Sequence, residues 1–182
     1  ALEVARVNAC VSLPISDDEV VIDSMLGWLV RWLRMLGIRA AYSPNFSDEE
    51  LLNVNHLLVT KDRELFRKRP RLSLLLNTPR HVEWLSILSL VLGFPLILNM
   101  ERSLCPICGS RLVKVSGDSV IGKVPRSVLL RNNEFWLCTG CGKVYWVGGH
   151  HTRINKELEI ARSILSMLSI SCVNNNLLII RE

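Results

Sequence analysis

The sequence lacks any apolar run long enough to cross a membrane. The longest such run, Trp84–Met100, falls short of the ~20 residues that a membrane helix needs, and Gly93 and Pro95 interrupt it. Low-complexity segments are absent, as is the basic, apolar and small-residue order of a secretory signal peptide at the N-terminus. These absences argue against a membrane-spanning or fibrous chain. They lead us to expect a folded cytoplasmic protein.

The composition allows a substantial core. Of the 182 residues, 49% are hydrophobic and 21% are charged, which suits one ordinary domain plus a small module. The net charge of +5 is distributed unevenly, because residues 1–60 are net acidic whereas residues 61–80 and 101–153 are net basic. Basic segments attract phosphate-rich partners such as RNA, although the same charges equally fit a solvated surface.

Cysteines are arranged in two Cys-x-x-Cys pairs. Cys105 pairs with Cys108 and Cys138 with Cys141, and a glycine after each pair lets the backbone turn. Two such pairs supply the four thiolates of a closed, tetrahedral structural zinc site. We therefore predict one structural zinc ion in a ribbon-type module, held in a reducing cell interior.

Other features of the cysteines leave alternatives open. Tetrahedral sulfur sites also accept iron, and the pairs could instead be redox-active, although a redox site needs only one pair near a βαβ unit. Cys10 and Cys172 stand alone and are expected to be free, buried or half-buried thiols. Aromatic residues flank the second pair; we expect most to form the core of the module and one or two to stack on bases. They are Phe135, Trp136, Tyr145 and Trp146.

Before residue 100, short apolar runs alternate with helical patterns. We predict strands at 20–22, 38–42, 57–60, 72–76 and 96–98, and helices at 25–36, 48–52, 64–69 and 80–92. Ser24 and Ser47 are candidate N-caps, the latter in a capping box with Glu50, and Gly37 is a natural helix end. This alternation indicates an α/β fold with a parallel sheet flanked by helices.

The pattern changes near residue 100, which divides the chain into four parts. Residues 1–19 are an N-terminal extension, 20–100 the α/β domain, 101–153 a small β zinc-ribbon module, and 154–182 a helical tail. The tail ends in the apolar segment Leu177–Ile180, which we expect to pack on the body of the protein or on a partner.

Acidic residues directly follow two predicted strands. Asp23 comes after 20–22 and Asp62 lies just beyond 57–60, so both should emerge where the carboxyl ends of parallel strands bind ligands. With Asp48, they are candidate oxygen ligands for Mg²⁺ or Mn²⁺, which support phosphodiester hydrolysis. Alternatively, Asp48 only favours the start of its helix and Asp62 is only a turn residue.

An ordered set of segments resembles the Mut-7 C-terminal RNase domain family. The segments are Val21–Gly27, Arg31–Gly37, Ser47–Leu52, Thr60–Leu65, Cys105–Cys108, Glu134–Trp146 and Gly148–His150. The resemblance covers about residues 20–153. The ordered set is specific, although each of the early segments alone is weak.

The resemblance implies a PIN-like nuclease domain with a zinc ribbon, and metal-dependent cleavage of single-stranded or structured RNA. It implies that Asp23, Asp48 and Asp62 bind one or two Mg²⁺ or Mn²⁺ ions. Further helpers would be Glu49, Glu64, Arg31 and Arg34. The two arginines would hold phosphates or orient the carboxylates, unless they only form a solvated helix face. The expected RNA-binding residues are Lys61, Arg63, Arg67, Lys68, Arg69, Lys143 and Trp146.

The sequence departs from the family pattern in places. Trp28 stands where a basic residue is usual, and Lys61 and Leu104 each replace a usual arginine. The link from Leu52 to Leu57 is shorter than usual, and the sequence indicates no clear fourth acidic ligand. Two alternatives therefore stay open. One is a non-catalytic RNA- or ribosome-binding protein that keeps the nuclease fold, and the other is a toxin-type nuclease whose antitoxin docks on the apolar tail.

Overall fold

The computed structural model describes residues 1–42 and 44–182. The first half of the chain forms β1 (Leu2–Val7), β2 (Val20–Ile22), the 3₁₀ turn η1 (Ser24–Leu26), α1 (Gly27–Met35), β3 (Ala40–Tyr42), α2 (Asp48–Asn53), β4 (Leu57–Thr60), α3 (Arg63–Lys68), β5 (Ser73–Leu76) and α4 (His81–Leu92). The second half forms β6 (Leu112–Val115), η2 (Gly117–Val120), α5 (Arg126–Arg131), β7 (Phe135–Cys138), β8 (Val144–Tyr145), α6 (Gly149–Leu165), β9 (Leu168–Val173) and β10 (Asn176–Arg181).

A mixed sheet with the strand order β3-β2-β4-β5-β1-β10-β9 forms the centre of the larger body. The strands β3, β2, β4 and β5 are parallel, as the alternating pattern predicts. The strands β1, β10 and β9 extend this sheet with antiparallel pairings. Because the parallel strands run the same way, their carboxyl ends share one edge. We call the residues that follow β2, β4 and β5 the carboxyl edge.

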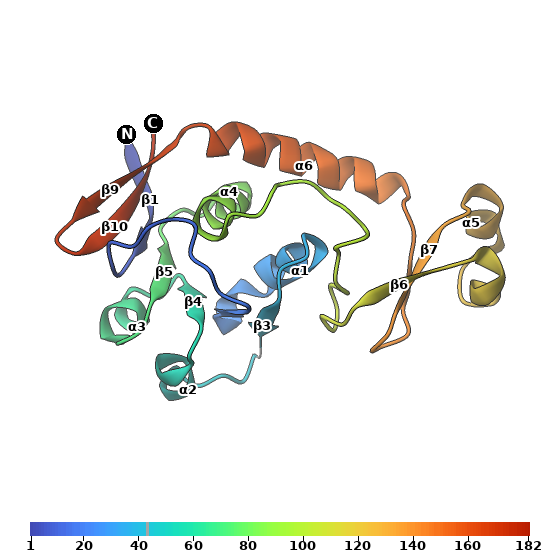
Figure 1. Cartoon of the computed structure of the whole chain (residues 1–182), viewed down its shortest axis with the longest axis horizontal. Helices are drawn as coiled ribbons and strands as arrows, with labels where there is room; N and C mark the ends of the chain where they lie inside the picture. The colour runs from blue at the N-terminus through green and yellow to red at the C-terminus, as the bar shows by residue number, and fades with distance from the viewer. Residues whose placement is uncertain (43) are drawn as a thin grey trace.

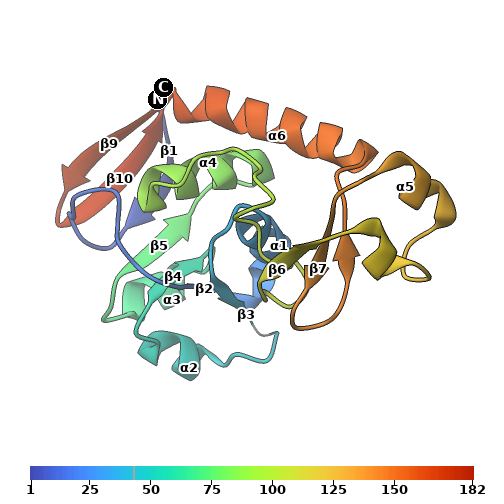
Figure 2. The same ribbon diagram turned by 45° about the vertical axis from the view of Figure 1, so that its right-hand side comes forward.

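Helices cover both faces of the parallel part of the sheet (Figure 1). Alternate residues of β2 point to opposite faces, since Val20 and Ile22 pack in the main core with α1, α4 and α6, whereas Val21 packs in a smaller core with α2 and α3. The helix α6 runs from the small β module back along α4 to the β9–β10 hairpin (Figure 2). None of the helices in the described part of the chain is long and apolar enough to span a bilayer.

Several local predictions are confirmed. The capping box is present, because the Ser47 hydroxyl accepts from the Glu50 amide at 3.1 Å and the Glu50 carboxylate accepts from the Ser47 amide at 2.8 Å. Gly37 ends the first helix with a positive φ of 87°. A Cβ atom there would lie 2.8 Å from the carbonyl oxygen of Arg102, so glycine also permits the close approach of the chain that leads into the small module.

Other predictions are wrong. Residues 96–98 form no strand, and Ser24 begins a 3₁₀ turn without capping α1. The tail is helical only to Leu165, after which β9 and β10 form a hairpin in the main sheet, and the N-terminal extension contributes β1 to that sheet. Leu177–Ile180 is therefore not a docking edge for a partner, because it belongs to β10, an interior strand that pairs with both β1 and β9.

The prediction of free thiols outside the zinc module is also wrong. Cys10 and Cys172 form a disulfide across a sequence separation of 162 residues, with their Cα atoms 5.7 Å apart. It links the loop after β1 to the outer strand β9. Disulfides persist in oxidising compartments and in the intracellular proteins of hyperthermophiles. The pairing therefore removes the cysteine argument for a reducing cell interior.

The small module contains the sheet β6-β7-β8 and a core of its own. Its long spacer between the cysteine pairs is not a simple β-hairpin, because η2 and α5 lie between β6 and β7. The core that these elements share is buried and apolar. It consists of Val120, Val124, Val128, Phe135 and Val144. The module lies at the opposite end of α6 from the β9–β10 hairpin (Figure 1).

Candidate functional site

The cysteine pairs converge in the small module. The sulfur atoms of Cys105, Cys108, Cys138 and Cys141 all lie within 4.8 Å of one another, which is the arrangement predicted from their spacing. The amides of Gly140 and Cys141 point at the Cys138 sulfur at 3.4 Å each. Four sulfur donors with amide hydrogen bonds fit a closed tetrahedral zinc site; zinc itself stays a prediction.

Neighbouring groups polarise these thiols differently. The hydrogen bonds that Cys108 receives from Ser110 lower its pKa to about 6, whereas burial raises the pKa of Cys138 to about 11. Burial also raises the pKa of Tyr145, so its hydroxyl stays protonated and donates to the Cys105 sulfur at 3.0 Å. A metal ion that binds all four sulfurs must therefore displace protons from the less acidic thiols.

Arg34 connects this module to α1. Its guanidinium donates to the carbonyl groups of Pro106 and Ile107, at 3.3 and 3.1 Å, and to that of Ala40 at 3.1 Å. Its own carbonyl accepts from the Leu104 amide at 2.8 Å. Arg34 thus braces the first cysteine knuckle and is not free to hold a phosphate. Arg31, on the same helix, is exposed.

At the carboxyl edge, Thr60 bridges the side chain of Asp23 and the backbone of Asp62. The Thr60 hydroxyl donates to Asp23 Oδ2 at 2.6 Å and accepts from the Asp62 amide at 2.9 Å. Asp23 is 6% exposed, and Ser24 Oγ donates weakly to its other oxygen at 3.4 Å. Within the described residues, Asp23 has no ion pair with a Lys, Arg or His side chain. A buried carboxylate with hydroxyl partners alone suits a bound cation.

The second carboxylate has a structural task as well. Asp62 Oδ1 caps α3 by accepting from the amides of Glu64 and Leu65, at 2.9 and 3.1 Å. The sequence predicted that Asp62 is either a turn residue or a metal ligand. The structure shows a third role, the N-cap of α3, which uses only one of the two carboxylate oxygens. Oδ2 is the oxygen left for a metal ion.

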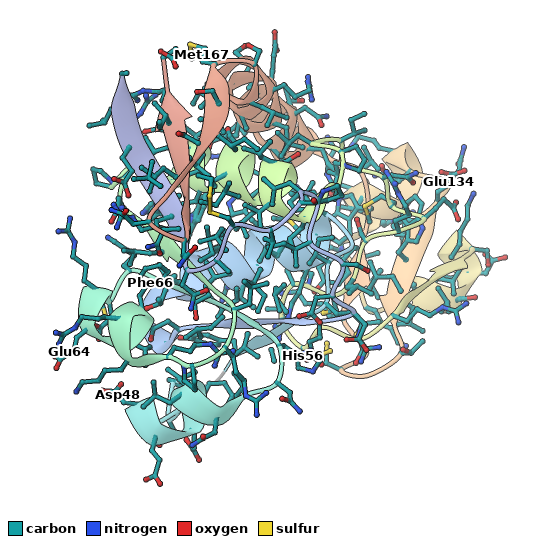
Figure 3. The ribbon with its side chains drawn as sticks, turned by 60° about the vertical axis from the view of Figure 1, so that its left-hand side comes forward. Asp48, His56, Glu64, Phe66, Glu134 and Met167 are labelled. Carbon is teal, nitrogen blue, oxygen red and sulfur yellow. A yellow bond between two sulfur atoms is a disulfide. The ribbon has the colours of Figure 1, made fainter. Side chains whose placement is uncertain are left out.

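Asp48 is the third candidate ligand and is exposed in the first turn of α2. Among the residues that the structure describes, Asp23, Asp48 and Asp62 do not form a group of ligand side chains within 4.8 Å of one another. Glu49 is exposed beside it, and Glu64 pairs with Lys68 at 3.0 Å. Figure 3 shows Asp48 and Glu64 on the outer surface of α2 and α3.

The residues expected to bind RNA have divergent environments. Lys61, Arg63, Arg67 and Lys143 are exposed, Lys68 is exposed but pairs with Glu64, and Trp146 is half-buried in the core of the small module. Arg69 is a correction. It is 4% exposed, and its guanidinium donates to the carbonyl groups of Leu51, Val54 and His56. Arg69 therefore holds the short α2–β4 link in place, with its guanidinium engaged by backbone carbonyl groups.

A basic groove that the sequence did not reveal lies beside α3. It has a volume of about 580 Å³ and is lined by residues from α3, from β5 and β1 with the positions that follow them, and from the start of β10. Figure 2 shows these elements at one end of the larger body. Its charged and polar lining comprises Glu3, Arg6, Asn8, Arg63, Arg67, Arg69, Asn77 and Asn176. Arg6 donates to both carboxylate oxygens of Glu3, at 2.8 and 3.0 Å. Arg63 directly follows Asp62, and Asn77 directly follows β5, so the groove reaches the carboxyl edge. The groove could have been predicted only from the antiparallel pairing of β1 with β5, which brings Arg6 and Asn8 to its lining.

Asp17, Asp18 and His56 form a further group whose ligand atoms lie within 4.8 Å of one another. They precede β2 and β4, at the opposite end of the parallel strands from Asp23. Asp17 already accepts from His56 Nδ1 and from the Leu57 amide, each at 2.8 Å. Its oxygens thereby hold two loops together, which is a structural role.

Comparison with known proteins adds one finding. A family model described as the Mut7-C RNAse domain matches residues 18–158, more than half of the chain. The matched span includes Asp23, Thr60, Asp62 and the four clustered cysteines. No curated protein and no solved structure matches the chain.

Proposed function

The chain belongs to the Mut7-C RNAse domain family, and from this premise we propose that it is a metal-dependent ribonuclease whose site lies at the carboxyl edge. The observation that carries the metal dependence is the environment of Asp23. This buried carboxylate has hydroxyl partners and no cationic partner in the described chain, and Thr60 links it to Asp62.

The donor chemistry of these residues fits Mg²⁺ or Mn²⁺. Both ions prefer carboxylate oxygens supplemented by water and substrate phosphate, and Asp23 and Asp62 offer such oxygens from neighbouring strands. When bound, the ion supplies Lewis acidity, which makes water a better nucleophile and offsets charge at the phosphorus atom. Thr60 would fix the orientation of Asp23, and the α3 cap would fix that of Asp62. Asp48, which is exposed in the first turn of α2, is the third candidate ligand.

The basic groove supports RNA as the substrate. The exposed residues Arg63 and Arg67 line it, and guanidinium groups bind phosphate oxygens in bidentate fashion. Arg6 also lines it but is already paired with Glu3. A strand whose phosphates follow this groove reaches Asp62 directly after Arg63. The small module, with Lys143 exposed beside its second cysteine pair, would add a further basic surface.

RNA cleavage tests this proposal. We expect the zinc-loaded protein to cleave a single-stranded RNA when Mn²⁺ is added and not without added divalent cation. Asp23→Asn should lower the rate on the order of 100-fold or more, since a direct ligand matters at least as much as its outer partners. Asp18→Asn is the matched control, because Asp18 is an exposed carboxylate at the opposite end of the strands. Equal cleavage by Asp23→Asn and the native protein would refute the assignment.

The non-catalytic alternative keeps one observation in its favour, which is that Asp23, Asp48 and Asp62 form no ligand group within 4.8 Å in the described chain. It predicts salt-sensitive RNA binding without cleavage under any divalent cation. The toxin alternative rested on Leu177–Ile180 as a docking edge for an antitoxin. This segment belongs to an interior strand, so the observation no longer supports that alternative.

A further inference from the structure

Aromatic rings gather beside Asp23 in a cluster that the sequence pattern did not indicate. The aromatic cluster consists of Trp28, Trp32, His81 and Trp84. The His81 ring centroid lies 4.6 Å from that of Trp28 and 4.5 Å from that of Trp84. Trp28 also lies 5.4 Å from Trp32. The planes of these ring pairs are tilted by 36–42°, so the rings form one contiguous cluster between α1 and the start of α4.

The members of the aromatic cluster differ in exposure. Trp32 and Trp84 belong to the main core, and the indole N–H of Trp84 donates to the Thr78 carbonyl at 2.7 Å. Trp28 is half-buried and His81 is exposed. Trp28 packs against the core ring of Trp32 and His81 against the core ring of Trp84, and these contacts restrict the motion of the two outer rings. Rigid exposed rings offer a planar ligand a surface at low entropic cost.

The aromatic cluster adjoins the carboxyl edge. Trp28 lies in the first turn of α1, separated from Asp23 by the 3₁₀ turn η1. Lys61 directly follows Thr60, and its ammonium group lies 5.3 Å from the centroid of the Trp84 ring. The rings therefore lie on the α1 and α4 face of the sheet, whereas the basic groove lies on the α3 face.

Cationic side chains flank the rings. Lys61 is exposed, and the Arg80 side chain is 52% exposed and directly precedes His81. Arg80 lies 3.9 Å from Glu83, a loose contact, because Glu83 already pairs with Arg181 at 3.0 Å and accepts from Thr78 at 2.7 Å. Both cations thus remain able to meet phosphates beside a stacked base.

We propose that Trp28 and His81 form a stacking site for one unpaired RNA base, with Lys61 and Arg80 on the neighbouring phosphates. The proposal rests on the proposed function and narrows its substrate to RNA that is single-stranded at the site. The RNA strand would follow the basic groove on the α3 face of the sheet and cross the carboxyl edge at Asp23 and Asp62. The base that follows would then stack on the rings of Trp28 and His81. A base-paired nucleotide cannot stack in this way.

Binding without cleavage tests the stacking site. Fluorescein-labelled single-stranded oligoadenylate would be titrated with zinc-loaded protein, without added divalent cation, and fluorescence anisotropy recorded. We expect Trp28→Leu and His81→Ala each to weaken binding about tenfold, as loss of one base stack does. His150→Ala is the matched control for His81, since both are exposed histidines in the first turn of a helix, and it should bind like the native protein.

A second set of probes separates stacking from folding. Each probe carries one abasic ribose, at a different position. For the native protein, one position should weaken binding about tenfold, and Trp28→Leu should lose that sensitivity. Uniform sensitivity in both proteins, unchanged binding by His81→Ala, or no RNA binding at all would overturn the stacking site. Cleavage with unchanged His81→Ala binding would refute this inference and leave the nuclease intact. If the native protein shows the expected abasic pattern but no Mn²⁺-dependent cleavage, the stacking site would stand and the nuclease proposal would be refuted.

Discussion

The small β module and the carboxyl edge hold their candidate metal ligands in different ways. In the module, four thiols from two local turns converge within 4.8 Å. At the carboxyl edge, Asp23 and Asp62 come from separate strands and are joined by the single hydroxyl of Thr60. Asp48 is exposed in the first turn of α2, and the three acids form no ligand group within 4.8 Å in the described structure.

The difference follows from what each site has to do. A closed sulfur site holds its ion permanently, so its ligands are brought together by short turns and supported by backbone amides. An oxygen site that exchanges Mg²⁺ and substrate needs open coordination positions. Its ligands therefore lie on a rigid sheet edge and leave room. In the proposed ribonuclease, the module would contribute stability and the edge would contribute chemistry.

Removing a zinc ligand should have the largest effect. Cys138→Ser takes away one thiolate, and structural zinc contributes apparent free energies of about 10–16 kcal/mol in zinc-finger peptides. We expect loss of the bound zinc and rapid proteolysis within residues 101–148, measured by metal analysis and mass spectrometry of the fragments. Cys172→Ser, which removes only the disulfide, should keep its zinc. Full zinc content in Cys138→Ser would show that the module does not depend on a four-thiolate site.

Arg34 tests whether the two regions depend on each other. Arg34→Met keeps the length of the side chain but removes the hydrogen bonds to the first knuckle, which we expect to lower the free energy of unfolding by about 3 kcal/mol. It should also speed the release of zinc to a chelator. Arg31→Met, on the same helix, is the control, because Arg31 is exposed. Equal zinc release by both variants would mean that the module holds its metal independently of α1.

Thr60 is the sharpest test of the carboxyl edge. Thr60→Val preserves shape but leaves the Asp23 carboxylate and the Asp62 amide without their shared partner, at a cost of about 2 kcal/mol in the free energy of unfolding. We also expect slower Mn²⁺-dependent RNA cleavage. Thr60→Ser retains the hydroxyl and should stay near native in urea unfolding and cleavage assays. A native cleavage rate in Thr60→Val would contradict the positioning role.

The sequence predicted what short-range rules determine. Strand ends placed Asp23 and Asp62 on one edge, and spacing brought the cysteines together. The sequence did not predict that Arg69 is buried, because its guanidinium binds carbonyl groups of the α2–β4 link that only the folded chain brings together. Nor could it predict the Cys10–Cys172 disulfide, whose partners lie 162 residues apart.

One missed element did carry a signal. Asn174 and Asn175 have positive φ angles of 51° and 63°, as the central residues of a type I′ hairpin turn require. Adjacent asparagines between two β-prone runs therefore indicated the β9–β10 hairpin. The helical periodicity of residues 154–168 predicts a helical tail, whereas the helix ends at Leu165 and the residues after it form the edge of the sheet.

The smallest expected effect concerns His56, at the end of the strands away from the carboxyl edge. The hydrogen bond to Asp17 raises the pKa of His56 above its usual 6.5. Burial opposes ionisation of Asp17, but hydrogen bonds from the Leu57 amide and His56 outweigh it and lower its pKa. The stability that protonated His56 contributes to the fold is therefore fully present below pH about 6.5, the usual pKa of the unfolded state. It is lost as the pH rises through the raised pKa of His56 in the folded protein.

His56→Gln removes this titration. The melting temperature of the native protein should exceed that of His56→Gln by about 2 °C at pH 5.5, because the pair is partly exposed and worth less than about 1 kcal/mol. The difference should shrink as the pH rises toward 8.5, and calorimetry across this range measures it. Asp17 stays ionised throughout, and the pH dependence of the zinc site cancels between the two proteins. A difference that grows with pH would show that the neutral imidazole is the form that stabilises the fold.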